Sequence, residues 1–578
     1  MNKSATIIRT VIIGLAGAIA VVSSAGAQSP TGPGPAAAPA PPASVESLDL
    51  GDPVETTTLA SDAFSIRVLE EDEGALDPSL WRGARADQVS FLFDQAPKGS
   101  ELPSVNALAR RVFLSGGDAP TGADVALHEK KLLTMIDAGL LDDARSIAGL
   151  SAVPYDKANA TLALYSGDVA TACSRASRVT SADRDLFWVK LRVLCYVASG
   201  ERNAADLTFN VLTERDALST SEKAYLQAAI SQAVPVSEPV TNALTLAIAN
   251  GIDGGISPAM IVDAPGGVIV AIAQNENAAL ATRITAARTG VAMGILPATI
   301  LPPLLQAVEL SVVELGNVRN ALQARPDDPT TDALVYQAVS EMSAPEFARD
   351  KAALIADTIS AARSFEVVYA RSKVYASDIE QMEGLLASPE MAAAFALSSA
   401  VNGDREAAFV WLSGMLGDAG SIVNLSEAQA ASFVEKVTLF ANLDGVAAAA
   451  LAERAGVILG EDKYAALLKH IPMDDGKLAQ VIDAAFDANA SQSVGQAGLV
   501  ALVVADQASF GGKVEGVVLD RALSILDVPT LRNQIAFERA LATRYRHIAP
   551  QAPAAAARDD EVVEEGGIRT PRIKPRGR

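Results

Sequence analysis

"LALYSGDVATAC" (162–173) contains the local signal from which the fold of this 578-residue chain follows. Apolar residues lead up to Tyr165, Gly167 and Asp168 interrupt them, and apolar residues then return at helical spacing. Glycine readily takes the left-handed conformation that ends a helix, and aspartate is a preferred N-cap of the helix that follows. The stretch therefore predicts two consecutive helices joined by a tight turn.

The same turn recurs elsewhere in the chain. It is found in "MIDAGLLDDARSIA" (135–148), "CYVASGERNAADLTF" (195–209), "LSSAVNGDREAAFVWL" (397–412) and "GVILGEDKYAALL" (456–468). Gly139, Gly167 and Gly200 are 28 and 33 residues apart, which is within the range of helix-hairpin repeats. The pattern predicts an all-α fold in which helical hairpins stack into an α-solenoid, or superhelix.

Two resemblances agree with this fold. The glycine–acid turn resembles that of tetratricopeptide-like α-solenoids over 130–220 and 390–475, although the spaced Trp, Tyr, Phe and closing Pro of that family are absent. In addition, "LDPSLWRG" (76–83), "LARRVFLSGGDAP" (108–120) and "DLFWVKLRVLC" (185–195) resemble segments of an uncharacterised exported proteobacterial helical family. The resemblances imply stacked helices and export, and they imply no activity.

Composition and charge narrow the classes of protein further. The chain is 49% hydrophobic but only 5% aromatic, which favours helix over a β-sandwich. Its formal net charge of −22 makes nucleic acid an unfavourable partner. Beyond the N-terminus no stretch of 18 uninterrupted apolar residues occurs, so we expect a soluble mature protein that is not an integral membrane protein.

The N-terminus has the three parts of a secretory signal peptide. "MNKSATIIRTVIIGLAGAIAVVSSAGAQ" (1–28) begins with Lys3 and Arg9, continues with an apolar stretch and ends with small residues. We expect cleavage after Ala27 and a periplasmic location. The alternative is an uncleaved membrane anchor, for which the apolar stretch is short.

The chain has two cysteines, Cys173 and Cys195, which are 22 positions apart on the two helices of one expected hairpin. In an oxidising compartment such a pair predicts a structural disulfide. Two buried free thiols are the alternative.

Composition shifts divide the chain into seven parts. These are a signal peptide (1–27), a Pro/Ala-rich disordered linker (28–60), an N-terminal helical segment (61–120), a helical-repeat block with the cysteine pair (121–234), a block of short helices punctuated by Gly and Pro (235–330), a C-terminal helical block (331–548) and a disordered tail that is first acidic and then basic (549–578). The short-helix block either continues the superhelix or forms a hinge between two helical arrays.

The basic end of the tail is a candidate interaction segment. Five cations fall within ten residues and would be attracted to anionic wall polymer or lipid head groups: Arg569, Arg572, Lys574, Arg576 and Arg578. The alternative is a tail that only adds solubility.

No motif for catalysis, cofactor binding or metal binding emerges. His128-Glu129 begins like a zinc-protease motif, but Leu132 stands where the second histidine is needed. We therefore expect His128 to be an exposed helical residue, and we expect no catalytic residues, no cofactor and no metal site.

These observations favour an exported, non-catalytic scaffold whose stacked helices bind a protein or peptide partner of the cell envelope. Two alternatives remain. One is an envelope-associated binder that uses the basic tail, and the other is a hydrolase that acts on envelope polysaccharide through carboxylates which the sequence does not identify.

Overall fold

A computed structural model describes residues 61–179, 185–231, 236–251, 255–382, 387–416, 425–459, 493–506, 513–528 and 530–548. The predicted signal peptide, linker and tail lie outside the described residues. Within these ranges the protein is all-α, as predicted: its β-type pairing is limited to one isolated bridge between Arg85 and Thr121.

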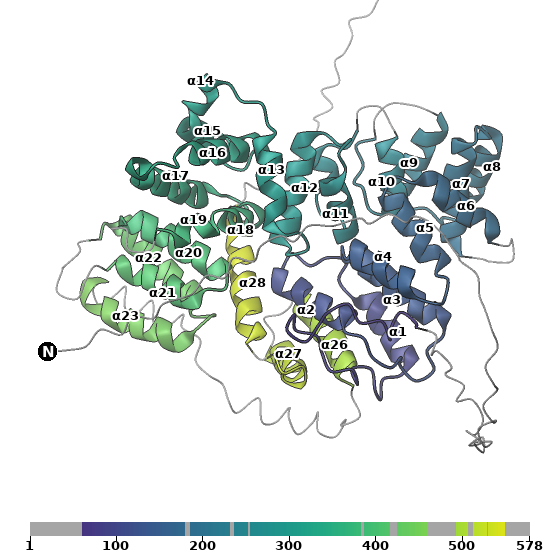
Figure 1. Ribbon diagram of the computed structural model, residues 1–578, viewed down its shortest axis with the longest axis horizontal. Helices are drawn as coiled ribbons and strands as arrows, with labels where there is room; N and C mark the ends of the chain where they lie inside the picture. The colour runs from purple at the N-terminus through teal and green to yellow at the C-terminus, as the bar shows by residue number, and fades with distance from the viewer. Residues whose placement is uncertain are drawn as a thin grey trace, which may run out of the picture. The chain divides into compact units, whose positions relative to one another are not determined.

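Within each described range the helices follow one another with short connections (Figure 1). The first half contains α1 (Ala86–Gln95), α2 (Pro103–Leu114), α3 (Val125–Asp137), α4 (Leu141–Leu150), α5 (Asp156–Tyr165), α6 (Val169–Arg178), α7 (Leu186–Ala198), α8 (Arg202–Glu214), α9 (Thr220–Ser231), α10 (Ala243–Asn250), η1 (Pro258–Ile261), α11 (Gly266–Gln274), α12 (Leu280–Ala292), η2 (Ala298–Ile300), α13 (Leu301–Gln306), α14 (Val312–Leu315) and α15 (Val318–Ala324). The second half contains α16 (Pro329–Glu341), η3 (Pro345–Phe347), α17 (Ala348–Ala361), α18 (Phe365–Val374), α19 (Ala376–Glu380), α20 (Pro389–Val401), α21 (Arg405–Gly414), α22 (Glu427–Phe440), α23 (Gly445–Leu459), α26 (Val494–Asp506), α27 (Lys513–Ile525) and α28 (Leu531–Ile548).

The left-handed glycine of the predicted turn is confirmed at Gly139, Gly167, Gly200 and Gly403, whereas the acidic cap is confirmed only after Gly167 and Gly403. The turn predicted at Gly460 lies outside the described residues. Gly167 and Gly403 have φ angles of 76° and 81°, in the left-handed region that favours glycine. The next residue caps the following helix in both cases, because the side chain of Asp168 accepts from the amide of Thr171 and that of Asp404 accepts from the amide of Ala407. Helices that are consecutive in sequence accordingly pack as pairs, such as α5 with α6 and α20 with α21.

A disulfide joins Cys173 of α6 to Cys195 of α7, the pairing that the sequence predicted. The two Cα atoms are 5.5 Å apart, within the usual range for a disulfide. Ala172 and Ala176 on the same face of α6 are buried, so the bridge lies beside a packed interface.

The short helices of the middle block continue the packing between the two helical arrays. Helix α11 contacts α3 and α5, whereas α12 contacts α18. A buried ion network holds this junction: Asp332 of α16 accepts from Arg288 of α12 at 2.9 Å and from the Nε of Arg371 of α18 at 2.8 Å. The same Arg371 donates to the carbonyls of Thr358 and Pro326, so its guanidinium is paired in spite of its burial.

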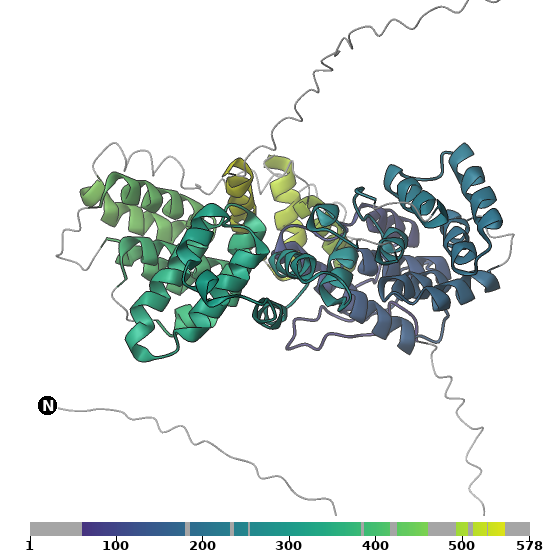
Figure 2. The same cartoon turned by 90° about the horizontal axis from the view of Figure 1, so that it is seen from above.

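The last helices pack against the first ones, which the sequence did not indicate. Helix α26 contacts α1 and α2, and α28 contacts α2, α18 and α22 (Figures 1 and 2). A side chain at Gly495 of α26 would lie 2.6 Å from the ring of Trp81, so glycine permits this close approach. Gly495 also donates its amide to the carbonyl of Leu80 at 2.6 Å.

Glu538 of α28 ties the two ends of the described fold together. Its carboxylate accepts from the amide of Ser104 at 2.9 Å and from the Ser104 hydroxyl at 2.7 Å, 434 residues away. Ser104 is in the first turn of α2, where backbone amides lack partners within the helix, so Glu538 acts as the cap of α2.

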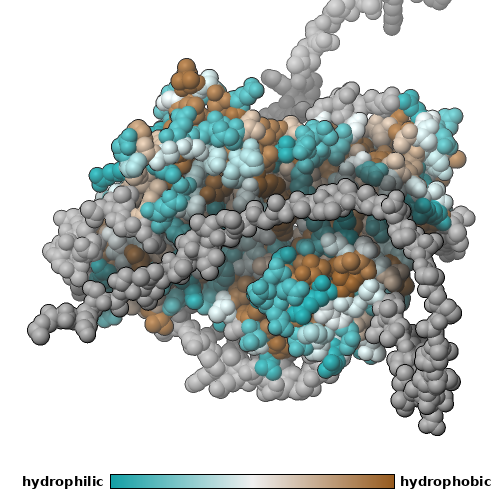
Figure 3. All heavy atoms as spheres, viewed as in Figure 1, coloured by the Kyte–Doolittle hydropathy of each residue, from teal (hydrophilic) through white to brown (hydrophobic). Residues whose placement is uncertain are grey.

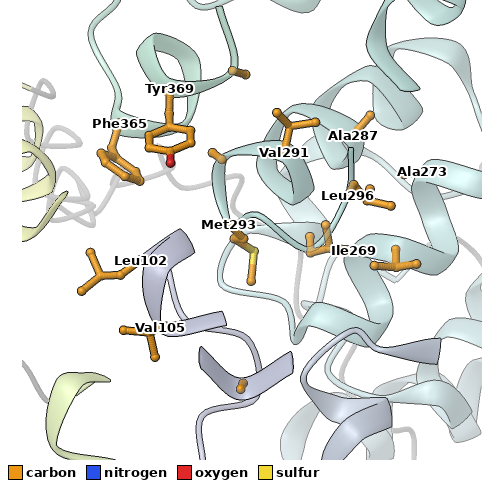
Figure 4. Close-up of a cluster of buried hydrophobic side chains, with 14 of the residues drawn as sticks. Leu102, Val105, Ile269, Ala273, Ala287, Val291, Met293, Leu296, Phe365 and Tyr369 are labelled. Atoms are coloured by element: carbon orange, nitrogen blue, oxygen red, sulfur yellow. The ribbon is translucent and has the colours of Figure 1, made fainter. Parts of the chain in front are cut away.

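An apolar cluster surrounds this contact. Figure 4 shows Leu102 and Val105 at the start of α2 near Met293, which follows α12, and near Phe365 and Tyr369 of α18. All five residues are less than 10% exposed. The cluster therefore joins the N-terminal, middle and C-terminal helices in one core.

We predict that replacing both cysteines by serine lowers the free energy of unfolding by about 3 kcal/mol, because the bridge restricts a loop of this length in the unfolded chain. Urea denaturation of the oxidised proteins measures the difference. Reduction of the wild type should reproduce the loss, and reduction of the double variant should have no effect. Equal stability of oxidised wild type and double variant would contradict the prediction.

A cationic cavity between four helices

The residues that the sequence singled out do not come together in one site. The cysteine pair is in the α6–α7 hairpin, and the five tail cations lie outside the described residues. The expectation for His128 is wrong: it is only 9% exposed and stacks edge-to-face on Phe64, with a ring centroid distance of 5.2 Å. Burial lowers the pKa of His128, and its Nδ1 lies 3.6 Å from Asp62. Its role is packing of the N-terminal segment.

A different part of the molecule forms a built polar site. A cavity of about 730 Å³ opens between α17, α20, α22 and the last turns of α28. Four basic side chains line it, and we call it the cationic cavity: Arg319, Arg349, Lys436 and Arg544. Its volume is within the range of ligand-binding cavities in proteins.

Lys436 of α22 is at the buried end of the cationic cavity. It is 7% exposed, and the one hydrogen bond that its ammonium makes with the described residues goes to the hydroxyl of Ser432, at 3.2 Å. Burial, together with the neighbouring charge of Arg544, lowers the pKa of Lys436 to about 8. An ammonium group has three donors, so Lys436 retains capacity to donate to a ligand.

Arg544 lies beside it on α28. Its guanidinium is 5.3 Å from the ring centroid of Tyr545 and forms an ion pair with Glu435 through Nε. The Nη1 atom is buried and has no hydrogen-bond partner among the described residues. Tyr545 is 4% exposed, and burial raises its pKa to about 12, so it contributes a neutral wall.

Acidic residues at the cavity belong to its exposed rim. Asp357 pairs with Arg319 at 3.6 Å, and Glu390 accepts from the side-chain Nε2 of Gln429 at 2.5 Å. This hydrogen bond is the main cause that lowers the pKa of Glu390. Asp350 is exposed beside Arg349. None of these carboxylates is hydrogen-bonded to Lys436.

The remaining wall is apolar and made of small side chains. Ala356 of α17 and Ala393, Ala394 and Leu397 of α20 are all at most 5% exposed. A wall of this kind can pack against aliphatic groups while the two inner cations bind an anion. The arrangement suits a ligand that carries both an acidic and an apolar group.

Sequence reasoning did not find this site, because its basic residues come from segments more than 200 residues apart, between Arg319 and Arg544. Lys436 follows "EAQAASFVE" (427–435) in an amphipathic helix, where a lysine is ordinarily a solvated residue. The local signal available was the spacing of Phe433, Lys436, Val437 and Phe440, which places the lysine on the apolar face.

Outside the cationic cavity, the described residues provide neither a metal site nor a membrane-spanning helix, and they include an exposed apolar tip. Among the described residues, no group of three or more His, Cys, Asp and Glu is arranged to hold a metal ion. None of the helices in the described ranges has the length and hydropathy needed to cross a membrane. In Figure 3 apolar colour marks the tip formed by α14, where Val312 and Val313 are 85% and 73% exposed.

Fold and cavity together define a protein of packed α-helical hairpins with a cavity lined by four basic side chains. The sequence matches no protein-family model, and neither a curated protein nor a solved structure shows significant similarity to it.

We predict that Lys436→Met stabilises the ligand-free protein at pH 7 by about 1–3 kcal/mol, because it removes a buried charge. In the folded protein the pKa of Lys436 is about 8, below its ordinary value of 10.5. The folded state therefore binds fewer protons than the unfolded state between these pH values, and this lysine's contribution to stability rises with pH across that window. The stability difference between Lys436→Met and the wild type should therefore become smaller as the pH rises from 8 to 10.

Urea denaturation at pH 7, 8, 9 and 10 measures this difference in chains that end at Ala549, so that the acidic residues of the tail cannot act as a ligand. Lys223→Met, at an exposed lysine of α9, is the matched control. A Lys436→Met protein that is less stable than the wild type at pH 7, or an advantage independent of pH, would contradict the prediction.

Proposed function

We propose that this protein is an exported, non-catalytic helical-repeat scaffold of the bacterial periplasm that binds a protein or peptide partner through the cationic cavity. The observation that carries the proposal is the unused hydrogen-bonding capacity of Lys436 and Arg544 beside an apolar wall. A buried ammonium whose hydrogen-bond partner is a neutral hydroxyl, as in Lys436, costs free energy, and Arg544 keeps, besides its ion pair with Glu435, an Nη1 without a partner among the described residues. Their presence in an open cavity favours a ligand that supplies an anion.

The compartment is inferred from two features. The segment 1–27 has the composition of a cleaved signal peptide with a cut after Ala27, and the Cys173–Cys195 disulfide suits an oxidising compartment. A structural disulfide in a chain that also begins with an export signal is consistent with the periplasm.

The partner would be a protein or peptide of the cell envelope. The cationic cavity is large enough for several side chains, and its rim is formed by exposed residues of α17 and α20, such as Ser360 and Ser388. Helical hairpins of this kind commonly present such surfaces to extended peptides.

In-cell photo-crosslinking tests the proposal. A photoreactive residue at Ser360 should capture a discrete set of envelope proteins, because this position is at the rim of the cavity. The same residue at Arg202, exposed on α8 away from the cavity, is the control position. Adding Lys436→Met should reduce capture from Ser360 about tenfold, the equivalent of one charge-assisted hydrogen bond.

Three outcomes separate the possibilities. Capture that occurs from position 360, but not from position 202, and that is reduced by Lys436→Met supports the proposed scaffold function. Equal capture from Ser360 and Arg202, unaffected by Lys436→Met, contradicts it. Capture that instead vanishes when the chain ends at Ala549 would move the binding function to the basic tail.

A further inference from the structure

A segment that follows α28 shortly in sequence has the charge and apolar groups that would complement the cationic cavity. "DDEVVEE" (559–565) has five carboxylates around two adjacent valines. The buried end of the cavity offers Lys436 and Arg544, the rim adds Arg319 and Arg349, and the wall between them is alanine-rich. Acidic groups flanking a small aliphatic pair complement cations flanking an alanine wall.

The connection is short enough for binding within the same chain. Tyr545 itself lines the cavity, and α28 ends at Ile548. Eleven positions separate Ile548 from Asp559, which allows an extended reach of about 36 Å. A segment tethered so closely acts at an effective concentration on the order of millimolar, so even a weak intrinsic affinity fills the site.

The acidic residues at the rim of the cavity do not occupy the inner basic groups that an acidic segment would bind. Asp357 is paired with Arg319, and Glu390 is hydrogen-bonded to Gln429. At the inner end, the carboxylate next to Arg544 is Glu435, which leaves Nη1 of Arg544 and the ammonium of Lys436 to receive a further carboxylate.

We propose that the acidic segment 559–565 occupies the cationic cavity in the free protein, with its carboxylates on Lys436 and Arg544 and Val562 or Val563 on the alanine wall. This inference rests on the proposed function, since it concerns the same cavity, and it adds the ligand class and its regulation. The ligand class is an acidic peptide with adjacent aliphatic residues. A partner must displace the chain's own segment, which raises the partner concentration needed for binding.

Competition with a synthetic peptide tests this in the full-length chain. The probe is a fluorescein-labelled peptide of residues 557–567, and its binding is followed by fluorescence anisotropy at low ionic strength. The test variant neutralises the segment with Asp559→Asn, Asp560→Asn, Glu561→Gln, Glu564→Gln and Glu565→Gln. We expect the peptide to bind this variant at least tenfold more tightly than the wild type, because the cavity is vacated.

Two further variants make the result specific. Lys436→Met in the neutralised background should weaken peptide binding again by about tenfold. The control neutralises the basic end instead, with Arg569→Gln, Arg572→Gln, Lys574→Gln, Arg576→Gln and Arg578→Gln, and should bind the peptide as weakly as the wild type does. Carbodiimide coupling of the wild type should yield an amide between Lys436 and a carboxylate of the segment.

The outcomes distinguish this inference from the proposed function. Equal peptide affinity for wild type and neutralised variant, with dependence on Lys436, would overturn occupancy by the chain's own segment and leave the cavity as a peptide site. No binding to the neutralised variant would overturn the ligand class. Lys436-dependent capture of envelope proteins from Ser360 would sustain the proposed function in either case.

Discussion

The hydrogen bonds between Glu538 and Ser104 are the contact on which the arrangement of the described helices depends. A carboxylate on the last helix caps the second helix, and it is almost completely buried at 1% exposure. Burial raises its pKa to about 7, and the two Ser104 hydrogen bonds and the nearby Lys373 oppose this rise. The folded state thus favours the protonated acid, so the contribution of this group to stability is greatest below pH 4.5 and falls as the pH rises towards 7.

The cationic cavity is a consequence of the same contact. Glu538 fixes α28 against α2, and Arg544 and Tyr545, less than two turns further along α28, then lie across α22 and its Lys436. Arg546 on the same turn pairs with Glu101 just before α2, which adds a second link to the N-terminal helices. Without α28 in this position, Arg544 and the wall formed by Tyr545 would be missing from the cavity.

Local chemistry explains which features could be predicted from the sequence. The turns at Gly167 and Gly403 and the pairing of Cys173 with Cys195 involve residues close in sequence, whose consequences follow from helix geometry. The return of α26 and α28 to the first helices could not be predicted, because Glu538 looks like any helical glutamate and its partner is 434 residues away. The burial of His128 could not be predicted either, because it depends on a contact with Phe64 from a separate loop.

Hydrogen–deuterium exchange at pH 6 in Glu538→Ala and Glu538→Gln proteins tests the central role of this contact most directly. Glutamine keeps one acceptor oxygen for Ser104, whereas alanine keeps none. If Glu538 holds the helices together, the alanine variant will exchange faster in the first turn of α2 and along α28 and α22, with the α6–α7 hairpin unchanged and the glutamine variant intermediate. Exchange in α2 and α28 that is the same in all three proteins would contradict this account.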